Sequence, residues 1–234
     1  MLLLALETSA KAASVALHDG SRLLGESYQN TGLTHSQTLM VMAEDLLGQC
    51  GHTPQEVTDV AVAAGPGSFT GVRIGVAAAK GFAWGGELLC VGVSTLEAMA
   101  ENLGPWEGTV VPTMDARRSQ TYTAIFRSED GKLNRMIDDC AISYEELGEK
   151  LNSCKKPIFL VGDGAEICYN MLQETVPGLV LPPEHRRHQR ATGVALVAEK
   201  TLATGERPDG GSLKPNYLRL SQAERERLEK QKKE

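Results

Sequence analysis

The sequence predicts an α/β protein built as two lobes. Three short apolar stretches joined by tight turns open the chain, and helical and strand-like stretches then alternate up to residue 104. The same strand-strand-strand-helix order begins again after Gly104 and Pro105, which end the preceding helix. At 234 residues the chain is long enough to bury a core in each half. We therefore expect a first lobe at 1–104, a smaller second lobe at 105–216, and a tail at 217–234 that is partly solvated or disordered.

Three consecutive strands are expected at the start of the first lobe. They cover residues 2–6, 14–18 and 22–28. Asp19 and Gly20, between the second and the third stretch, form a strong hairpin signal. Tight turns of this kind join neighbouring antiparallel strands, so the lobe should open with an antiparallel meander.

Helices and strands alternate in the rest of the first lobe. Along the chain we expect a helix at 34–49, a strand at 57–64, a helix at 70–84, a strand at 88–93 and a helix at 95–102. Ser94 is in position to cap the last of these helices. Because two of the strands follow helices, this part of the sheet should be parallel.

The second lobe repeats the order of the first. Its expected elements are strands at 109–114, 121–126 and within 136–142, a helix at 144–151, a strand at 158–161, and helices at 165–174 and 191–204. The proline-containing stretch 176–190 is predicted to be a loop, and 208–215 a glycine-rich connector. Two β-β-β-α-β-α units in tandem, each a mixed sheet with helices, are the plan of the actin-like (ASKHA) two-lobed fold of sugar kinases and heat-shock ATPases.

Composition and charge narrow the possible functions. The net charge of −6 does not favour nucleic acid binding by the surface as a whole. The compact basic stretch 185–190 could contact RNA phosphate, or it could be a solvated loop. The apolar N-terminal stretch is short, lacks basic residues and ends at Glu7, so we expect no signal peptide and no membrane span. Five cysteines without metal or redox spacing indicate free thiols in the cytoplasm.

A glycine-rich stretch after the strand at 57–64 is the most distinctive motif. It runs Gly65-Pro66-Gly67-Ser68-Phe69-Thr70-Gly71, and the polar turn Glu7-Thr8-Ser9 ends the first strand of the chain. Such a turn can cradle phosphate at a helix N-terminus, but the Gly-Lys-Ser/Thr ending of a P-loop is missing. The motif is therefore either a nucleotide site or a structural turn. Its candidate residues are Glu7, Thr8, Ser9, Gly65, Gly67, Ser68, Thr70 and Gly71.

We find no catalytic or metal-binding constellation in the sequence. His35 opens the helix at 34–49, but Leu39 occupies the i+4 position where a second metal ligand would stand. The sequence has no serine-nucleophile elbow. Asp115 follows a strand of the second lobe and could be catalytic, but Arg117 and Arg118 come next, so an ion-paired loop carboxylate explains it at least as well. Asp163, between Gly162 and Gly164, is most simply a turn residue. We expect no catalytic residue and no metal.

The two helices beside the glycine motif carry more apolar side chains than one sheet face requires. Two explanations stay open: the lobes bury the surplus internally, or the helices pair with another subunit. For the second explanation the candidate interface residues are His35, Thr38, Leu39, Met42, Leu46, Val72, Arg73, Val76, Ala79 and Lys80.

The glycine motif, continued by Val72-Arg73-Ile74-Gly75, resembles that of the TsaB (YeaZ) family of bacterial glycoprotease-like proteins. Leu6-Glu7-Thr8-Ser9, Thr34-His35-Ser36 and Tyr217-Leu218-Arg219 match the same family. The resemblance covers essentially the whole chain. It implies the actin-like fold and a part in adding threonylcarbamoyl to the adenosine next to the anticodon of tRNAs that read codons beginning with A.

The resemblance also implies a division of labour between subunits. A related partner, TsaD, holds a metal through a His-x-x-x-His pair and transfers the group from threonylcarbamoyl-AMP, and an ATPase, TsaE, completes the complex. TsaB pairs through its first two helices with TsaD, or with itself when alone. tRNA would be met mainly through the complex.

The residues and the resemblance together predict a non-catalytic scaffold subunit with no cofactor of its own. A nucleotide at the junction with partner subunits stays open. The alternative is a nucleotide-dependent ATPase or phosphotransferase of the same fold, based on residues 7–9 and the glycine motif. A third interpretation, a metalloprotease, is disfavoured because His35 lacks a second ligand.

Overall fold

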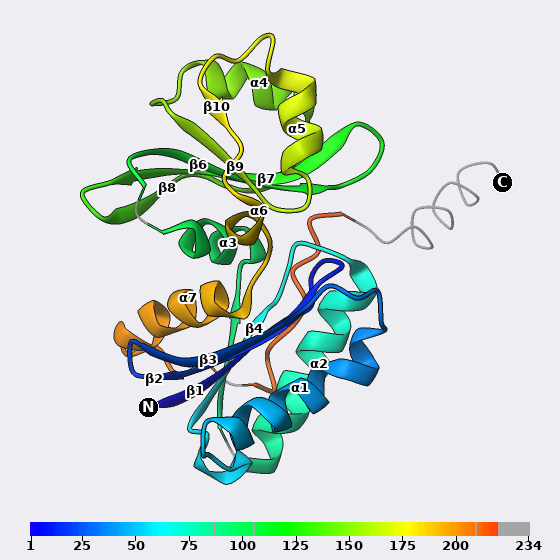
Figure 1. Cartoon of the computed structure of the whole chain (residues 1–234), viewed down its shortest axis with the longest axis vertical. Coiled ribbons are helices and arrows are strands. Elements are labelled where there is room, and N and C mark those ends of the chain that lie inside the picture. The colour runs from blue at the N-terminus through cyan, green and yellow to red at the C-terminus, as the bar shows by residue number, and fades with distance from the viewer. Residues whose placement is uncertain (87, 105, 209, 220–234) are drawn as a thin grey trace, which may run out of the picture.

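Two lobes, each built around a five-stranded sheet, make up the molecule (Figure 1). The computed structural model describes residues 1–86, 88–104, 106–208 and 210–219. Both sheets combine antiparallel and parallel strands. The predicted two-lobed α/β class is therefore confirmed.

The sheet of the first lobe has the strand order β3-β2-β1-β4-β5. Its strands are β1 (Leu2–Glu7), β2 (Ala13–Asp19), β3 (Arg22–Gln29), β4 (Asp59–Ala63) and β5 (Leu89–Val93). The first three strands pair antiparallel, which confirms the predicted meander. Strands β1, β4 and β5 pair parallel, as the alternation with helices predicts.

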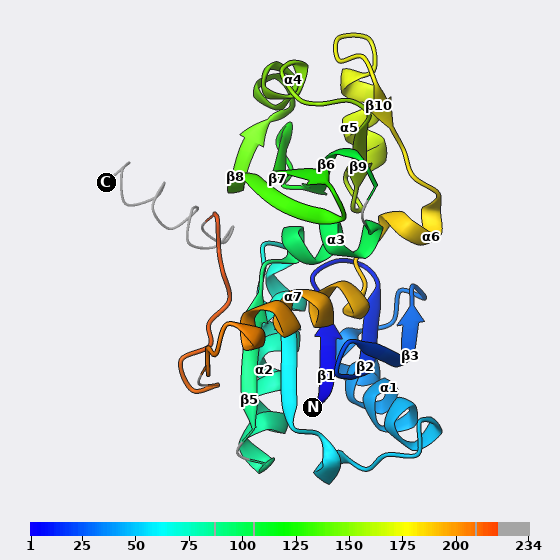
Figure 2. The same cartoon turned by 90° about the vertical axis from the view of Figure 1, so that its left-hand side faces the viewer.

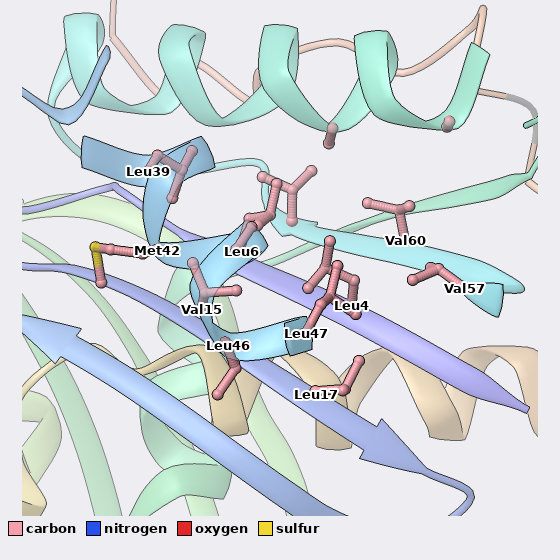
Figure 3. Packing of buried hydrophobic residues seen from close by; sticks show 14 of the residues in the cluster. Leu4, Leu6, Val15, Leu17, Leu39, Met42, Leu46, Leu47, Val57 and Val60 are labelled. Carbon is pink, nitrogen blue, oxygen red and sulfur yellow. The ribbon is translucent and has the colours of Figure 1, made fainter. Parts of the chain in front are cut away.

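Helices cover both faces of this first sheet (Figure 2). Helices α1 (His35–Gln49) and α2 (Phe69–Gly86) lie on one face, and α7 (Ala191–Ala203) lies on the other. Because side chains alternate along a strand, Leu4 of β1 packs under α1 and α2 (Figure 3), whereas its neighbour Leu3 packs against α7. Complete burial of a leucine side chain contributes about 1.5–3 kcal/mol, so β1 stabilises the lobe from both faces.

The sheet of the second lobe has the strand order β10-β9-β6-β7-β8. Its strands are β6 (Gly108–Asp115), β7 (Gln120–Glu129), β8 (Lys132–Ser143), β9 (Ile158–Val161) and β10 (Leu179–Val180). Helices α4 (Tyr144–Asn152) and α5 (Ala165–Leu172) cover its outer face, and α3 (Thr95–Leu103) covers the face toward the first lobe. The order of elements thus repeats that of the first lobe, as predicted.

Two helices pack on the sheet opposite to the one that the sequence predicts. Helix α3 falls within the predicted first lobe, 1–104, yet its apolar side chains pack on the second sheet. Helix α7 falls within the predicted second lobe, 105–216, yet it packs on the first sheet. The boundary at residue 104 therefore does not follow the packing. An apolar stripe identifies the buried face of a helix but not the sheet that it covers.

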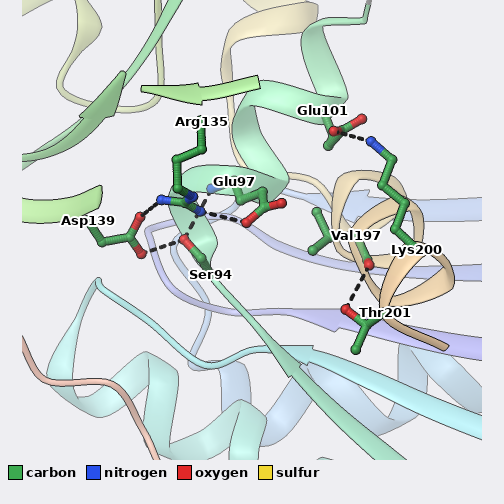
Figure 4. Close-up of polar contacts among 8 residues, drawn as sticks. All are labelled: Ser94, Glu97, Glu101, Arg135, Asp139, Val197, Lys200 and Thr201. Carbon is green, nitrogen blue, oxygen red and sulfur yellow. Dashed lines mark hydrogen bonds and ion pairs between the residues drawn. The ribbon is translucent and has the colours of Figure 1, made fainter. Parts of the chain in front are cut away.

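Helices α3 and α7 contact each other and join the two lobes. A Cβ at Gly193 would collide with the carbonyl oxygen of Ala98, so glycine is what allows the helices to approach this closely. Lys200 of α7 forms an ion pair with Glu101 of α3 (Figure 4). The lobes are thus connected by helix packing as well as by the chain itself.

Polar contacts tie the start of α3 to the second sheet (Figure 4). Arg135 of β8 donates to Glu97 Oε2 and to Asp139 Oδ1, each at 2.6 Å. Ser94 donates to Asp139 Oδ2 at 2.5 Å. The same hydroxyl accepts from the Glu97 N–H at 3.2 Å, which confirms Ser94 as the predicted cap.

Two stretches of the second lobe differ from their predicted structure. The loop predicted at 176–190 contains strand β10 and a short helix, α6 (Glu184–Arg187). The strand predicted within 136–142 is the 12-residue β8. Strand β10 has only two residues and is defined by its pairing with β9, so the sequence alone gives no sign of it. Strand β8 lies at the edge of the sheet with one face toward solvent, and its polar residues on that face interrupt the apolar pattern.

Of the tail predicted at 217–234, the structure describes only Tyr217, Leu218 and Arg219, and the rest lies outside the described residues. A short 3₁₀ helix, η1 (Pro54–Glu56), was not predicted. The five cysteines are not joined in disulfide bonds, in line with the predicted thiols. Within the described ranges, no helix combines the length and the apolar character that crossing a bilayer requires.

Candidate functional site

A cleft of about 660 Å³ lies between the two lobes. The first lobe contributes residues 9–11 and 66–70 to its walls, the second lobe contributes 114–117 and Asp163, and the C-terminal segment contributes 216–219. The end of the first strand of each lobe and the glycine motif therefore meet at one place.

The glycine motif packs directly on the polar turn at the end of β1. The Ser68 N–H donates to the Ser9 carbonyl oxygen at 2.7 Å, and Thr8 Oγ1 donates to the Gly71 carbonyl oxygen at 2.8 Å. A Cβ at Gly67 would lie 2.6 Å from the same Ser9 oxygen. The glycines thus let two backbone segments touch, and the Ser68 donor is already used. This geometry favours the structural-turn interpretation over the phosphate cradle.

Gly65 makes a second close contact, with the C-terminal segment. Its φ of 114° lies in the left-handed region that favours glycine. The Asn216 N–H donates to the Ala64 carbonyl oxygen at 2.6 Å, and a Cβ at Gly65 would lie 2.5 Å from the Asn216 carbonyl oxygen. The Gly65 carbonyl oxygen accepts from the Thr95 N–H at 2.9 Å. Packing within this chain therefore explains why residue 65 is glycine, without a bound phosphate.

The first turn of α2 faces the cleft. The Ser68 hydroxyl accepts from the Gly71 N–H at 3.3 Å, so Ser68 is the cap of this helix. Thr70, in the first turn of the helix, is exposed and lines the cleft. One of the orphan N–H groups of the helix start is therefore satisfied by the motif itself.

Glu7 ends β1 with a buried carboxyl group. Its side chain is 1% exposed, and the Ser9 N–H donates to its Oε1 at 2.5 Å. Burial raises the pKa of Glu7 to about 7; hydrogen bonding by Ser9 opposes this rise, and the charge of Asp163 adds to it. Among the described residues, the second oxygen, Oε2, has no hydrogen-bond partner. A carboxyl group with this pKa is partly protonated at neutral pH.

The turn after β6 forms the opposite wall of the cleft. Arg117, Arg118 and Ser119 have φ values of 61°, 55° and 57°, in the left-handed region that side chains disfavour. Asp115 Oδ1 accepts from the Arg117 N–H at 2.7 Å and so stabilises the turn. The structure gives Asp115 a local structural role, while Arg117 lines the cleft together with Lys11.

Asp163 lies in the turn between β9 and α5, on the same wall. Gln189 Nε2 donates to its Oδ1 at 2.8 Å. Desolvation by the surrounding chain raises the pKa of Asp163, and the Gln189 hydrogen bond opposes that rise. The Gly164 N–H next to it donates to the Thr113 carbonyl oxygen at 3.1 Å. Asp163 is thus a turn residue, as predicted, and it also lines the cleft.

His35 is committed to a contact within the chain. Its Nε2 forms a hydrogen bond with the Ala10 carbonyl oxygen at 2.9 Å. Leu39, one turn along α1, is 1% exposed and belongs to the core. In the part of the chain that the structure describes, no group of three His, Cys, Asp or Glu side chains is placed to hold a metal ion.

The interface predicted on α1 and α2 needs correction. Six of its residues are buried in the core of this chain and are at most 6% exposed: Leu39, Met42, Leu46, Val72, Val76 and Ala79. For these six, the first explanation holds, because the lobe itself buries them. His35 and Thr38 are half-buried, and Lys80 donates to the carbonyl oxygens of Gly211 and Leu213. Arg73 alone among the ten is exposed.

The outer faces of α1 and α2 keep a smaller apolar surface. Met40 and Val41 are 40% and 55% exposed, and Trp84 near the end of α2 is 87% exposed. These three residues are not among the ten predicted interface residues. The sequence does contain a sign of them, because Met40 and Val41 are apolar residues between the core positions Leu39 and Met42. Recognising them as exposed requires knowing which face of the helix packs on the sheet.

Two arginines of the basic stretch 185–190 form ion pairs within the chain. Arg187 Nη2 lies 2.8 Å from Glu166 Oε1, and Arg190 Nη1 lies 2.7 Å from Glu26 Oε2. Both carboxylates come from elements far away in the sequence. These pairs favour the loop interpretation over an RNA contact for the two arginines.

Two lobes of repeated topology around a central cleft define a protein of the actin-like class. The ROK hexokinase of Thermus thermophilus is a solved structure with a TM-score of 0.51 and 12% identity, covering 88% of this chain and 100% of the hexokinase chain. At this identity the similarity shows the fold alone. The predicted actin-like fold is confirmed.

Sequence similarity then identifies the family within this class. The family model of TsaD, tRNA N6-adenosine threonylcarbamoyltransferase, matches residues 29–227. The tRNA threonylcarbamoyladenosine biosynthesis protein TsaB of Bacillus subtilis is 31% identical over 99% of this chain and 100% of its own length. A crystal structure from Pseudomonas aeruginosa, described as an uncharacterised protein similar to peptidase YeaZ, has a TM-score of 0.79 and 28% identity over 93% of this chain and 99% of that one. The chain belongs to the TsaB family, with a role in tRNA threonylcarbamoyladenosine biosynthesis, and the predicted resemblance is confirmed.

Proposed function

We propose that this chain is a non-catalytic subunit required for threonylcarbamoyl transfer from threonylcarbamoyl-AMP to the adenosine next to the anticodon of tRNA. The observation that carries the proposal is the environment of His35. A histidine bonded to a backbone carbonyl and a buried Leu39 at i+4 do not form the His-x-x-x-His pair expected of the catalytic subunit. The contribution of this chain would therefore be binding rather than chemistry.

The proposed partners are a TsaD-like catalytic paralogue and a TsaE-like ATPase, with a homodimer when the chain is alone. The outer faces of α1 and α2 are the proposed docking surface, because Met40, Val41 and Trp84 are exposed there. Exposed Glu44 and Asp45 on α1 would form a polar rim around this apolar centre. tRNA would be met mainly through the complex, in the cytoplasm.

Reconstitution tests this proposal. Transfer to tRNA should require this chain together with TsaD and TsaE. Val41→Glu and Trp84→Glu should each weaken partner binding roughly tenfold or more, because a charge would enter the apolar centre of the interface. Ile167→Glu, the same kind of change at a 44% exposed position of α5, is the matched control and should have no effect. Full transfer by TsaD and TsaE alone would contradict the proposal.

A nucleotide-dependent ATPase or phosphotransferase is the second candidate. The cleft favours it, because Lys11, Arg117 and Arg219 line the walls and could neutralise phosphate. The use of the glycine motif for internal packing counts against it. Calorimetry with ATP and magnesium separates the two, since micromolar binding by this chain alone would support the second candidate. A metalloprotease would instead carry stoichiometric zinc in elemental analysis.

A further inference from the structure

The C-terminal segment 210–219 runs along the first lobe and ends at the second (Figure 2). Near its start, Lys80 Nζ of α2 donates to the carbonyl oxygens of Gly211 at 3.1 Å and Leu213 at 3.3 Å. The Leu213 side chain packs against the core under α2, and Gly92 of β5 leaves room for it, because a Cβ there would collide with Leu213. The base of the segment is therefore anchored on α2 and β5.

The middle of the segment is held at the start of α2. The Tyr217 ring stacks on Phe69 with 4.9 Å between ring centroids. Arg73, one turn further along α2, places its guanidinium 3.8 Å from the Phe69 ring centre and donates from Nε to the Tyr217 hydroxyl at 2.6 Å. The three side chains stabilise one another. Arg73 is also exposed on α2, the helix proposed to meet a partner.

The end of the segment reaches the second lobe. Arg219 Nη1 donates to the Ala116 carbonyl oxygen at 2.7 Å. Ala116 directly precedes the three left-handed residues 117–119, and this turn lines the cleft. Residues 216–219 line the same cleft. One continuous segment thus contacts α2, the cleft and the turn after β6.

We propose that residues 213–219 form a latch that couples the outer face of α2 to the interlobe cleft. The inference rests on the proposed docking of a partner at α2. A partner that covers Arg73 removes water from its guanidinium, which strengthens the contacts of Arg73 with Phe69 and Tyr217. Tyr217 then keeps the segment docked, so that Arg219 stays on the turn after β6.

The latch has two states. In the latched state Arg219 holds Ala116, and the segment closes one side of the cleft. In the released state Tyr217 leaves Phe69, and the cleft loses the wall formed by 216–219. A partner bound at α2 favours the latched state. Linkage then requires that loss of the Arg219 contact weakens partner binding, although Arg219 lies at the cleft.

Hydrogen exchange of the full chain, alone and with the TsaD-like partner, tests the latch. Arg219→Ala should raise amide exchange in residues 115–120 roughly tenfold and weaken partner binding several-fold, because a charged hydrogen bond is lost. Lys214→Ala is the matched control and should change neither, because Lys214 is exposed on the same segment and its side chain forms no hydrogen bond or ion pair among the described residues. Tyr217→Phe keeps the stacked ring, loses only the Arg73 hydrogen bond, and should give a smaller effect of the same sign.

Unchanged exchange at 115–120 in Arg219→Ala would overturn the latch. The latch would also be overturned if Arg219→Ala exchanged faster at 115–120 but bound the partner as tightly as the wild-type chain. Failure of the wild-type chain to bind the partner would contradict the proposed docking instead, and exchange in the isolated chain would still test the link between segment and turn. If Arg219→Ala raises exchange throughout both lobes, the variant is destabilised as a whole, and the milder Tyr217→Phe is used instead. Faster exchange at 115–120 in Tyr217→Phe supports the latch, and unchanged exchange there overturns it.

Discussion

The two lobes present corresponding turns to the cleft, and the turns differ in how much of each is left accessible. In the first lobe the turn at 7–9 follows β1 and lies under the glycine motif. In the second lobe the turn at 115–119 follows β6 and is largely exposed. Glu7 is buried with an unpartnered oxygen among the described residues, whereas Asp115 is exposed and stabilises its own turn.

Each lobe also has a glycine-containing segment after a parallel strand, β4 in one and β9 in the other. A Cβ at Gly71 would collide with the Thr8 carbonyl oxygen, and one at Gly162 would collide with the Thr113 carbonyl oxygen. The repeated topology therefore brings backbones into close contact in both lobes. Only in the first lobe does this contact bury the turn at the cleft. Topology decides where the turns lie, and local packing decides which of them remains free to contact other groups.

Gly71→Ala should break the first-lobe turn and have the largest effect. The added methyl group would meet the Thr8 carbonyl oxygen, a backbone atom that cannot move away alone. We expect a loss of about 3 kcal/mol or more in the free energy of unfolding, measured by urea denaturation. Gly81→Ala is the control in the same helix, because no described atom outside the adjoining helix backbone lies within 4 Å of its Cβ position, and it should be neutral or stabilising. Equal effects of the two changes would refute the close-packed turn.

The buried carboxyl of Glu7 should make stability depend on pH. Its pKa rises from 4.5 to about 7 on folding. Below pH 4.5 the group is protonated in both states and contributes nothing. From pH 4.5 to 7 the unfolded chain releases the proton while the folded chain keeps it, so the free energy of unfolding falls by up to about 3 kcal/mol, and the deficit persists above pH 7.

Glu7→Gln tests this dependence. The variant should lack the fall between pH 4.5 and 7 and should exceed the wild-type chain in stability at pH 8, as measured by thermal or urea unfolding across pH. Asp115→Asn in the corresponding turn should lower the overall stability modestly without removing the fall. A fall of equal size in Glu7→Gln would show that another group is responsible.

Arg118→Gly, in the exposed turn of the second lobe, should change the free energy of unfolding least. Arg118 has a φ of 55° and is exposed, so glycine relieves an unfavourable backbone conformation without removing a buried contact. We expect a gain of about 0.5–1 kcal/mol, the relief being partly offset by the greater freedom of the unfolded chain. Differential scanning calorimetry would measure it. Glu145→Gly in the first turn of α4 should instead destabilise, and a loss of stability in both variants would contradict the proposed strain.

Much of the fold was predictable because local sequence carries it. Asp19 and Gly20 predicted the hairpin between β2 and β3, and Ser94 predicted the start of α3. Each of these inferences uses residues within a few positions of one another, where chain geometry leaves few alternatives.

The interface prediction shows where local information ends. Leu39 and Val76 are among the candidate interface residues, yet both lie in the core, while Val41 and Trp84 are exposed. The sequence shows how apolar a helix is. Which side of that helix is buried depends on the position of the sheet, and the sheet is assembled from strands far apart in the chain.

By itself, the sequence determined the two-lobed order of elements, the lone histidine on the first helix and the membership of the TsaB family. The tertiary structure alone decided which lobe α3 and α7 cover, the burial of Glu7, and the path of the C-terminal segment across Gly65 to Ala116. The physical reason is the range of the interactions. Turns, caps and helix periodicity depend on neighbouring residues, whereas burial and desolvation depend on every element that packs around a group.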